Sequence, residues 1–456
     1  MEAVGLGQAA DAVKQDQEAC KPAPQTRIFV NSFSFNQDHS HIVCGTTAGL
    51  RVYKICAAVS EVCRREECIA SVSRSVVLIA MLFRSNIFAM VSTGDNRKAN
   101  KVELYDMDRD QVTHSFRSRS QITGIALSRD VLVVVGESTI YAYDCDDFRL
   151  MLYLPTSRNP SGLCALTADT HPWILCCLGE SPTDVRVIFG QERDHTFRAH
   201  QTPLAAMALN SSGSLLVTGS EDGRVLKVFM TDNGELLYKL RRSINPAIEA
   251  KICCAVFSPD SLHLAVASSS KRRTVHVFKL DPRAGSGEGS AEHCDASSAA
   301  SSTQDDALLA ADAMSAFARA SNIVRTLSEG MMPARPPIPE TRSFARFNIP
   351  DVDTIHELDT RSGQARQDSV GRVCGPQLAF HHSEPRLWIL HYNGMLYECS
   401  FQPDHDASLG VQNIRLISAT TWFATRPDFK VHSAMVPTTC GGVDADDEEA
   451  DEWQLL

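Results

Sequence analysis

The residues from Phe33 to Ile55, FSFNQDHSHIVCGTTAGLRVYKI, give the clearest indication of the fold. In it an apolar strand ends at a small polar turn, and a second apolar strand leads into a hairpin that contains glycine. The same order of features returns in ALNSSGSLLVTGSEDGRVLKVF at 208–229 and in VFSPDSLHLAVASSSKRRTVHVF at 256–278. Apolar strands that recur with a period of about 40 to 45 residues are typical of propeller blades.

One apolar anchor in each repeat gives the number of blades. The anchors that align are Phe35, Phe83, Leu127, Leu166, Leu209, Phe257 and Phe380. Successive anchors are 48, 44, 39, 43, 48 and 123 residues apart, so only the last interval exceeds one blade, by about 75 residues. The sequence therefore predicts an all-β, seven-bladed β-propeller over residues 28–440, with a long insertion in blade 6. The regular period disfavours a β-sandwich, the weaker alternative.

The insertion covers residues 281–342 and has two parts. Its first part is small and polar, which is typical of a flexible loop. From Asp305 to Met331 apolar residues recur every three or four positions, so we expect an amphipathic helix whose apolar face includes Phe317, Val324 and Leu327. The N-terminal segment 1–27 and the acidic tail 441–456 are predicted to be disordered.

Composition excludes several classes of function. The formal net charge of −11 disfavours nucleic acid as the main partner. No apolar run approaches the roughly 20 residues of a membrane-spanning helix, and the first 21 residues lack the pattern of a signal peptide, so we expect a cytoplasmic protein. Fifteen cysteines without metal-ligand spacing indicate reduced, mostly buried thiols.

The chain also lacks the local motifs of nucleophilic, phosphate-loop and zinc enzymes. Its one histidine doublet is His381-His382, and adjacent positions on a strand face apart, so we expect two turn histidines rather than a shared metal site. The sequence therefore predicts that the protein is not an enzyme and needs no cofactor.

The stretch that suggests a binding function is YKLRRSINPAIEAKICCAVF at 238–257. Arg241 and Arg242 stand at the end of an apolar strand, where consecutive side chains point to opposite faces, so the pair should serve two different anion pockets. Guanidinium groups suit phosphate because their fork of donors binds two oxygens at once. Two solvated surface arginines are the alternative interpretation of these residues alone.

At this point the chain resembles the PROPPIN family, whose hallmark is a Phe/Leu-Arg-Arg-Gly motif, present here as Leu240 to Ser243. Segments such as MLFRSNIFAMVSTGD, AHQTPLAAMALN and FSPDSLHLAVASS are also similar to the family, in family order, over roughly residues 28–401. The resemblance implies a propeller that stands edge-on to a membrane and binds phosphatidylinositol 3-phosphate and the 3,5-bisphosphate. It also implies that the blade 6 loop enters the bilayer.

Carried over residue by residue, the resemblance implies two pockets. Pocket 1 would consist of His200, Thr218, Ser220, Gly223, Arg224, Lys227 and Arg241, and pocket 2 of Arg242, Ser270, Thr274 and His276. Arg224 and Lys227 stand where threonine and arginine are usual, and Ser243 replaces glycine, a change that would weaken pocket 2 if its backbone needs positive φ. The region 186–276 holds twelve Lys/Arg against eight Asp/Glu, so the acidity of the chain lies elsewhere.

The tail ends in Trp453-x-x-Leu456 behind an acidic run, which is similar to motifs that bind ubiquitin-like autophagy proteins; a plain solubilising tail is the alternative. We therefore expect a phosphoinositide effector, peripheral on autophagosomal precursor or endosomal and vacuolar membranes, that recruits autophagy or lipid-transfer partners. A WD-repeat-like protein scaffold that has lost lipid binding is the rival hypothesis, and the change to Ser243 is its main support.

Overall fold

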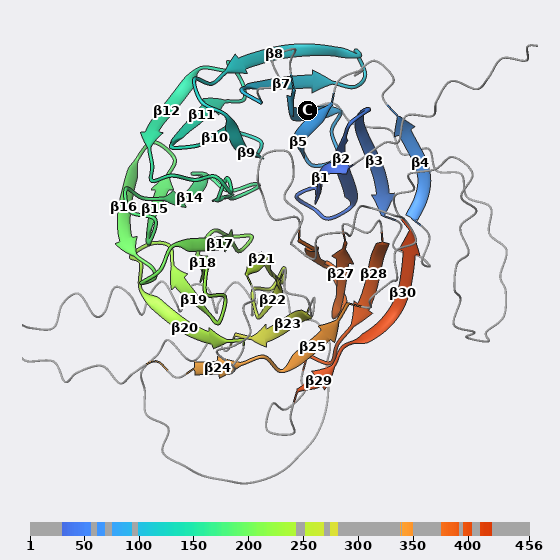
Figure 1. Cartoon of the computed structure of the whole chain (residues 1–456), viewed down its shortest axis with the longest axis vertical. Helices are drawn as coiled ribbons and strands as arrows, with labels where there is room; N and C mark the ends of the chain where they lie inside the picture. The colour runs from blue at the N-terminus through green and yellow to red at the C-terminus, as the bar shows by residue number, and fades with distance from the viewer. Residues whose placement is uncertain are drawn as a thin grey trace, which may run out of the picture.

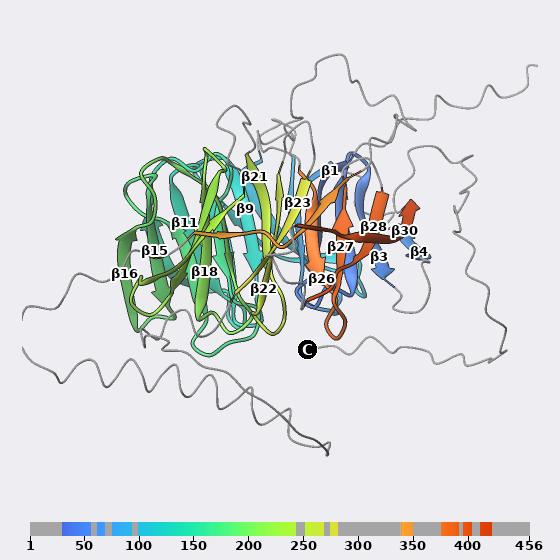
Figure 2. The ribbon, with the colours of Figure 1, turned by 90° about the horizontal axis from the view of Figure 1, so that it is seen from below.

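The computed structural model describes residues 30–55, 62–68, 75–93, 99–242, 251–268, 274–280, 338, 340–349, 375–391, 395–403 and 411–421. Within these residues seven β-sheets are arranged in a ring (Figure 1). Seen from the side, the strands run across the thickness of the disc (Figure 2). The prediction of a seven-bladed β-propeller is confirmed. The described ranges contain no helix, and so none that could cross a bilayer.

Each blade begins with an inner strand and proceeds outward through antiparallel neighbours. The strands of blades 1 to 3 are β1 (Val30–Phe35), β2 (His41–Thr46), β3 (Gly49–Ile55), β4 (Val62–Cys68), β5 (Val76–Met81), β6 (Ile87–Ser92), β7 (Lys101–Asp106), β8 (Gln111–Arg117), β9 (Ile122–Leu127), β10 (Val131–Gly136), β11 (Thr139–Asp144) and β12 (Leu150–Pro155).

Blades 4 and 5 follow the same pattern along the chain. Their strands are β13 (Cys164–Leu166), β14 (Ile174–Leu178), β15 (Asp184–Phe189), β16 (Arg193–Arg198), β17 (Leu204–Leu209), β18 (Leu215–Ser220), β19 (Val225–Met230) and β20 (Leu236–Arg241).

Blades 6 and 7 depart from a simple meander. Their strands are β21 (Ile252–Phe257), β22 (His263–Ser268), β23 (Thr274–Lys279), β25 (Ala345–Asn348), β26 (Gln377–Phe380), β27 (Arg386–Leu390), β28 (Met395–Ser400) and β30 (Arg415–Thr421). The fourth strand of blade 6, β25, comes only after the insertion, which therefore lies between the third and fourth strands of that blade. Two short strands pair in parallel outside blades 5 and 6: β24 (Glu340–Arg342) lies on β20, and β29 (Gln412–Asn413) lies on β25.

Six of the seven predicted anchors are the last residues of the inner strands of their blades. The anchor chosen for blade 2 is wrong, because the inner strand ends at Met81, which pairs with Phe88, and Phe83 lies in the following turn with a φ of 46°. The Phe83 ring is covered by the Arg129 guanidinium of blade 3, 4.5 Å from its centroid. This aromatic residue therefore joins two blades instead of starting one.

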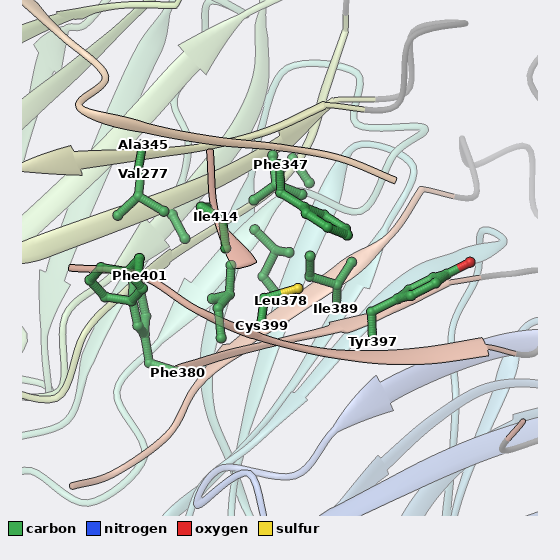
Figure 3. Close-up of a cluster of buried hydrophobic side chains, with 14 of the residues drawn as sticks. Val277, Ala345, Phe347, Leu378, Phe380, Ile389, Tyr397, Cys399, Phe401 and Ile414 are labelled. Atoms are coloured by element: carbon green, nitrogen blue, oxygen red, sulfur yellow. The ribbon is translucent and has the colours of Figure 1, made fainter. Parts of the chain in front are cut away.

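The blades are held together by apolar side chains: middle strands such as β10 are buried on both faces, whereas the outer strand β25 alternates buried and exposed residues. The cluster between blades 6 and 7 shows how β25 is fixed, because its residues Ala345 and Phe347 are buried against Leu378, Ile389 and Tyr397 (Figure 3). Burying a phenylalanine side chain contributes about 1.5 to 3 kcal/mol. The strand that returns from the insertion is thus anchored by the core of the ring.

Candidate functional site

Strand β20 places the two arginines on opposite faces of blade 5. Leu240 packs in a cluster with Val266 and Phe278 of blade 6, so even-numbered positions at this end of the strand face blade 6. Leu236, across the register shift, packs with blade 4 instead. Arg241 shares its face with Thr218 and Lys227, and Arg242, beyond the strand end, lies toward blade 6.

Pocket 1 has a wall of hydrogen-bonding groups between blades 4 and 5. Thr218 and Ser220 are buried at the end of β18, and the Thr218 Oγ1 atom lies 2.9 Å from Nε2 of His200, which is also buried. Lys227 donates from Nζ to the carbonyl of Ala199 at 2.7 Å. Burial, with a smaller effect of Lys227, lowers the pKa of His200 to about 4, so its ring is neutral at pH 7.

The hairpin that connects β18 and β19 closes the outer end of this pocket. Gly223 has a φ of 62°, in the left-handed region that glycine adopts without a steric penalty. Arg224 next to it is exposed and extends into solvent. The carbonyl of Gly223 accepts a hydrogen bond from Arg242 Nε at 3.0 Å, so the same turn borders both pockets.

Arg241 is held by a carboxylate from the far end of the insertion. Glu340 of β24 accepts from Arg241 Nη2 at 2.8 Å and from Nε through its other oxygen. Hydrogen bonding from Arg241 lowers the pKa of Glu340, so the carboxylate is ionised at neutral pH. A phosphate that enters pocket 1 would therefore find the hydrogen-bond donors of Arg241 already bound to Glu340.

Pocket 2 lies between blades 5 and 6 and contains a second buried histidine. His276 of β23 has Nδ1 3.0 Å from Ser343 Oγ, and burial, followed by the charges of Arg242 and Arg346, lowers its pKa to about 3. Thr274 is buried two positions before it on the same face. Arg242 is buried too, with 8% of its surface exposed. A cation, a neutral imidazole and hydroxyl groups therefore meet at this blade junction.

Sequence reasoning missed residues that the fold brings to these pockets. Lys239 is on the same face as Arg241, and strand alternation alone could have found it. Ser268 has its Oγ 3.5 Å from Thr274 Oγ1. Glu340 and Ser343 could not be found from local patterns, because they approach the pockets only through the strands that follow the insertion.

Other predicted residues lie outside the described residues. These are Ser243 and Ser270 of pocket 2, the insertion residues Phe317, Val324 and Leu327, and the tail residues Trp453 and Leu456. Their roles remain predictions, as do the insertion helix and the terminal segments.

The histidine doublet behaves differently from the expectation that its side chains face apart. His381 and His382 follow β26 in a turn, as expected, but their rings stack with centroids 4.5 Å apart. The residues of the described ranges form no group of three or more potential metal ligands. The described cysteines are free, and Cys44, Cys176, Cys177 and Cys399 are buried.

Comparison with known proteins agrees with the propeller fold. The family model described as PROPPIN matches residues 29–302. The WD repeat domain phosphoinositide-interacting protein 1 of Xenopus laevis is 32% identical over 252 residues, 54% of this chain and 56% of the relative. Autophagy-related protein 18 of Mycosarcoma maydis is 31% identical over 284 residues, 56% of this chain and 60% of the relative. The chain thus spans little more than half the length of these curated relatives.

Among solved structures, the crystal structure of Kluyvelomyces marxianus Hsv2 is similar, with a TM-score of 0.58. The alignment covers 87% of this chain and 99% of that chain at 17% sequence identity. At this identity the likeness supports the propeller fold alone.

Proposed function

The chain belongs to the PROPPIN family, and we propose that it is a phosphoinositide-binding effector that docks on membranes through pockets 1 and 2. The observation that carries the proposal is the arrangement of Arg241 and Arg242. They are consecutive in the chain, yet they lie on opposite faces of blade 5, each on a face that also carries buried hydroxyl groups and is flanked by a buried histidine. The family assignment agrees with a binding protein and not with an enzyme.

The chemistry of both pockets suits a phosphate monoester. Each guanidinium can donate two hydrogen bonds to phosphate oxygens, and charge-assisted bonds of this kind contribute about 1.5 to 3 kcal/mol each. The hydroxyl groups of Thr218 and Thr274 add donors at fixed positions. His200 and His276 are neutral when the pockets are empty, and a bound phosphate dianion would favour their protonated forms.

The names of the relatives suggest which membranes and partners to test. One relative is called phosphoinositide-interacting and another autophagy-related. We therefore propose phosphatidylinositol 3-phosphate and the 3,5-bisphosphate as ligands, on autophagosomal precursor or endosomal and vacuolar membranes facing the cytoplasm. Partners would be autophagy or lipid-transfer proteins, including a ubiquitin-like protein at Trp453 and Leu456.

We also propose that the insertion deepens membrane attachment. Its apolar positions Phe317, Val324 and Leu327 would enter the bilayer once the headgroup is bound, since an amphipathic segment gains apolar burial there. Replacing Phe317 and Val324 with Asp should reduce retention on liposomes and leave affinity for the soluble headgroup unchanged, because a charged side chain resists insertion. A sharp loss of thermal stability in this variant would show instead that the segment packs on the propeller.

The central test is flotation of the Arg241→Thr, Arg242→Thr double variant with liposomes that contain 5% phosphatidylinositol 3-phosphate. Binding should be lost while the chain remains folded at 25 °C, as judged by circular dichroism. The control is the Arg109→Thr, Arg149→Thr double variant, which removes the same charge from exposed arginines of blades 2 and 3. Undiminished flotation of the first variant would refute the proposal.

A protein scaffold without lipid binding is the second candidate. It is favoured by one observation, that Glu340 already occupies the donors of Arg241. The same flotation series separates the two functions, because a scaffold would not float with liposomes of any phosphoinositide.

A further inference from the structure

The two pockets are built on equivalent rows of consecutive blades. In blade 5 the strand register aligns Thr218, Lys227 and Lys239 across β18, β19 and β20. One blade further, the register aligns Val266, His276 and Arg346 across β22, β23 and β25. The outer strand therefore contributes a cation to this row in both blades, and in blade 6 that cation is Arg346.

The packing of β25 fixes the direction of Arg346. Ala345 and Phe347 are buried in the cluster between blades 6 and 7 (Figure 3), so the alternate residues Arg346 and Asn348 lie on the face toward blade 5. This is the face that carries His276 and Thr274. The backbone is held on both sides, since β25 pairs with β23 and the carbonyl of Arg346 accepts from the Ile414 amide at 2.9 Å.

The charges around Arg346 differ from those around its counterpart in pocket 1. Lys239 stands beside Glu340 of β24, whereas the residue beside Arg346 on the corresponding parallel strand, β29, is the neutral Asn413. Within the described ranges Arg346 forms no ion pair with a carboxylate. After burial, the charges of Arg242 and Arg346 are the causes that lower the pKa of His276, so both cations act on the same ring.

We propose that Arg346 is a phosphate-binding residue of pocket 2, where it and Arg242 hold one phosphate monoester of an inositol headgroup between them. This inference rests on the proposed function. An anion placed beside His276 would be attracted by both guanidinium groups and would offset the repulsion between them. Arg346 is then a cation of pocket 2 that no carboxylate within the described residues neutralises.

The test is calorimetry of the full chain with inositol 1,3-bisphosphate and, in a separate arm, inorganic phosphate. Arg346→Gln should weaken the bisphosphate affinity roughly five- to tenfold, as expected for loss of one charge-assisted contact at a solvent-accessible edge. Arg346→Lys should recover part of the loss. The control is Arg415→Gln, which removes an exposed arginine of β30 and the same charge, and which should change the affinity less than twofold by loss of long-range attraction alone.

The pKa of His276, followed by NMR of its ring, gives a second measurement. A purely structural role of Arg346 would leave this pKa unchanged. In the absence of ligand, Arg346→Gln should raise the pKa of His276, and the bisphosphate should raise it in the unaltered protein. Equal effects of Arg346→Gln and Arg415→Gln on affinity would overturn the inference while leaving the proposed function intact. No binding of the bisphosphate or of phosphoinositide liposomes by the unaltered protein would overturn the proposed function itself. Equal affinity for inorganic phosphate would overturn the assignment to an inositol headgroup.

Discussion

Replacing Glu340 with Gln should increase the affinity of pocket 1 for a phosphorylated headgroup. In the structure both oxygens of Glu340 accept hydrogen bonds from the Arg241 guanidinium. A phosphate that binds Arg241 has to displace this carboxylate, so the free energy of the ion pair is subtracted from the free energy of binding. Glutamine keeps the shape of the side chain but competes only as a neutral acceptor.

The size of the effect follows from exposure. The side chains of Arg241 and Glu340 are 32% and 40% exposed, so the pair is screened by solvent. Breaking a surface ion pair changes an equilibrium constant by about two- to fivefold, and we expect a gain in affinity of that size. Because the pair is screened, the gain should shrink at high salt.

The assay is calorimetry with inositol 1,3-bisphosphate at low and high salt, with Glu384→Gln as a matched control. Glu384 pairs with Arg386 on blade 7, where the side chains are 47% and 33% exposed, so the control removes the same charge from a similar ion pair. In an Arg241→Gln background the Glu340→Gln change should have no effect, since the interaction it relieves is gone. Equal gains from the two glutamate variants, or a loss of affinity on replacing Glu340, would show that Glu340 does not compete with the phosphate for Arg241.

Three further predictions concern stability. Arg242→Ala should lower the free energy of unfolding in urea by about 1 to 2 kcal/mol, because it removes a buried hydrogen bond from a charged donor. Arg241→Ala should leave the free energy of unfolding unchanged, and equal losses would contradict the different burial of the two arginines. Thermal stability should fall as the pH drops from about 6.5 toward 4, because the unfolded chain protonates His200 and His276 near pH 6.5 while the folded chain holds their pKa values at about 4 and 3. The fall should be shallower in His276→Gln, and an unchanged slope would contradict this assignment. Phe347→Ala should cost about 3 to 5 kcal/mol in urea unfolding, since it opens a cavity in the cluster that anchors β25; a loss below 1 kcal/mol would show that the strand is held otherwise.

The sequence allowed the propeller to be predicted because each blade repeats a local pattern of strands and turns. The blade 2 anchor failed for a local reason too. Met81, Leu82 and Phe83 are three apolar residues in a row, and the pattern alone does not show where the strand ends. Only pairing with Phe88 identifies Met81 as the last strand residue, and this leaves Phe83 for the turn.

Some residues of the candidate pockets could also be predicted from local sequence patterns. Alternation along β20 predicts opposite directions for Arg241 and Arg242, and the structure places them so. The pocket residues on the outer strands could not be predicted from the sequence. His276 and its neighbour Arg346 on β25 are 70 residues apart in the chain, and no local pattern sets their register. Glu340 was missed for the same reason, since its strand pairs with blade 5 after the chain has passed through blade 6.

The segment 340–348 connects both pockets, and its two strands are held very differently. β25 forms four antiparallel pairs with β23 and buries Ala345 and Phe347, whereas β24 has three parallel pairs with β20 and exposes Glu340. A force on the end of the insertion should therefore detach β24 first and leave β25 in place. Detachment would remove Glu340 from Arg241 while Arg346 keeps its position beside His276. Entry of the insertion into a bilayer would then open pocket 1 without disturbing pocket 2. Pocket 2, where Arg346 forms no ion pair within the described residues, would therefore bind first, and pocket 1 would follow.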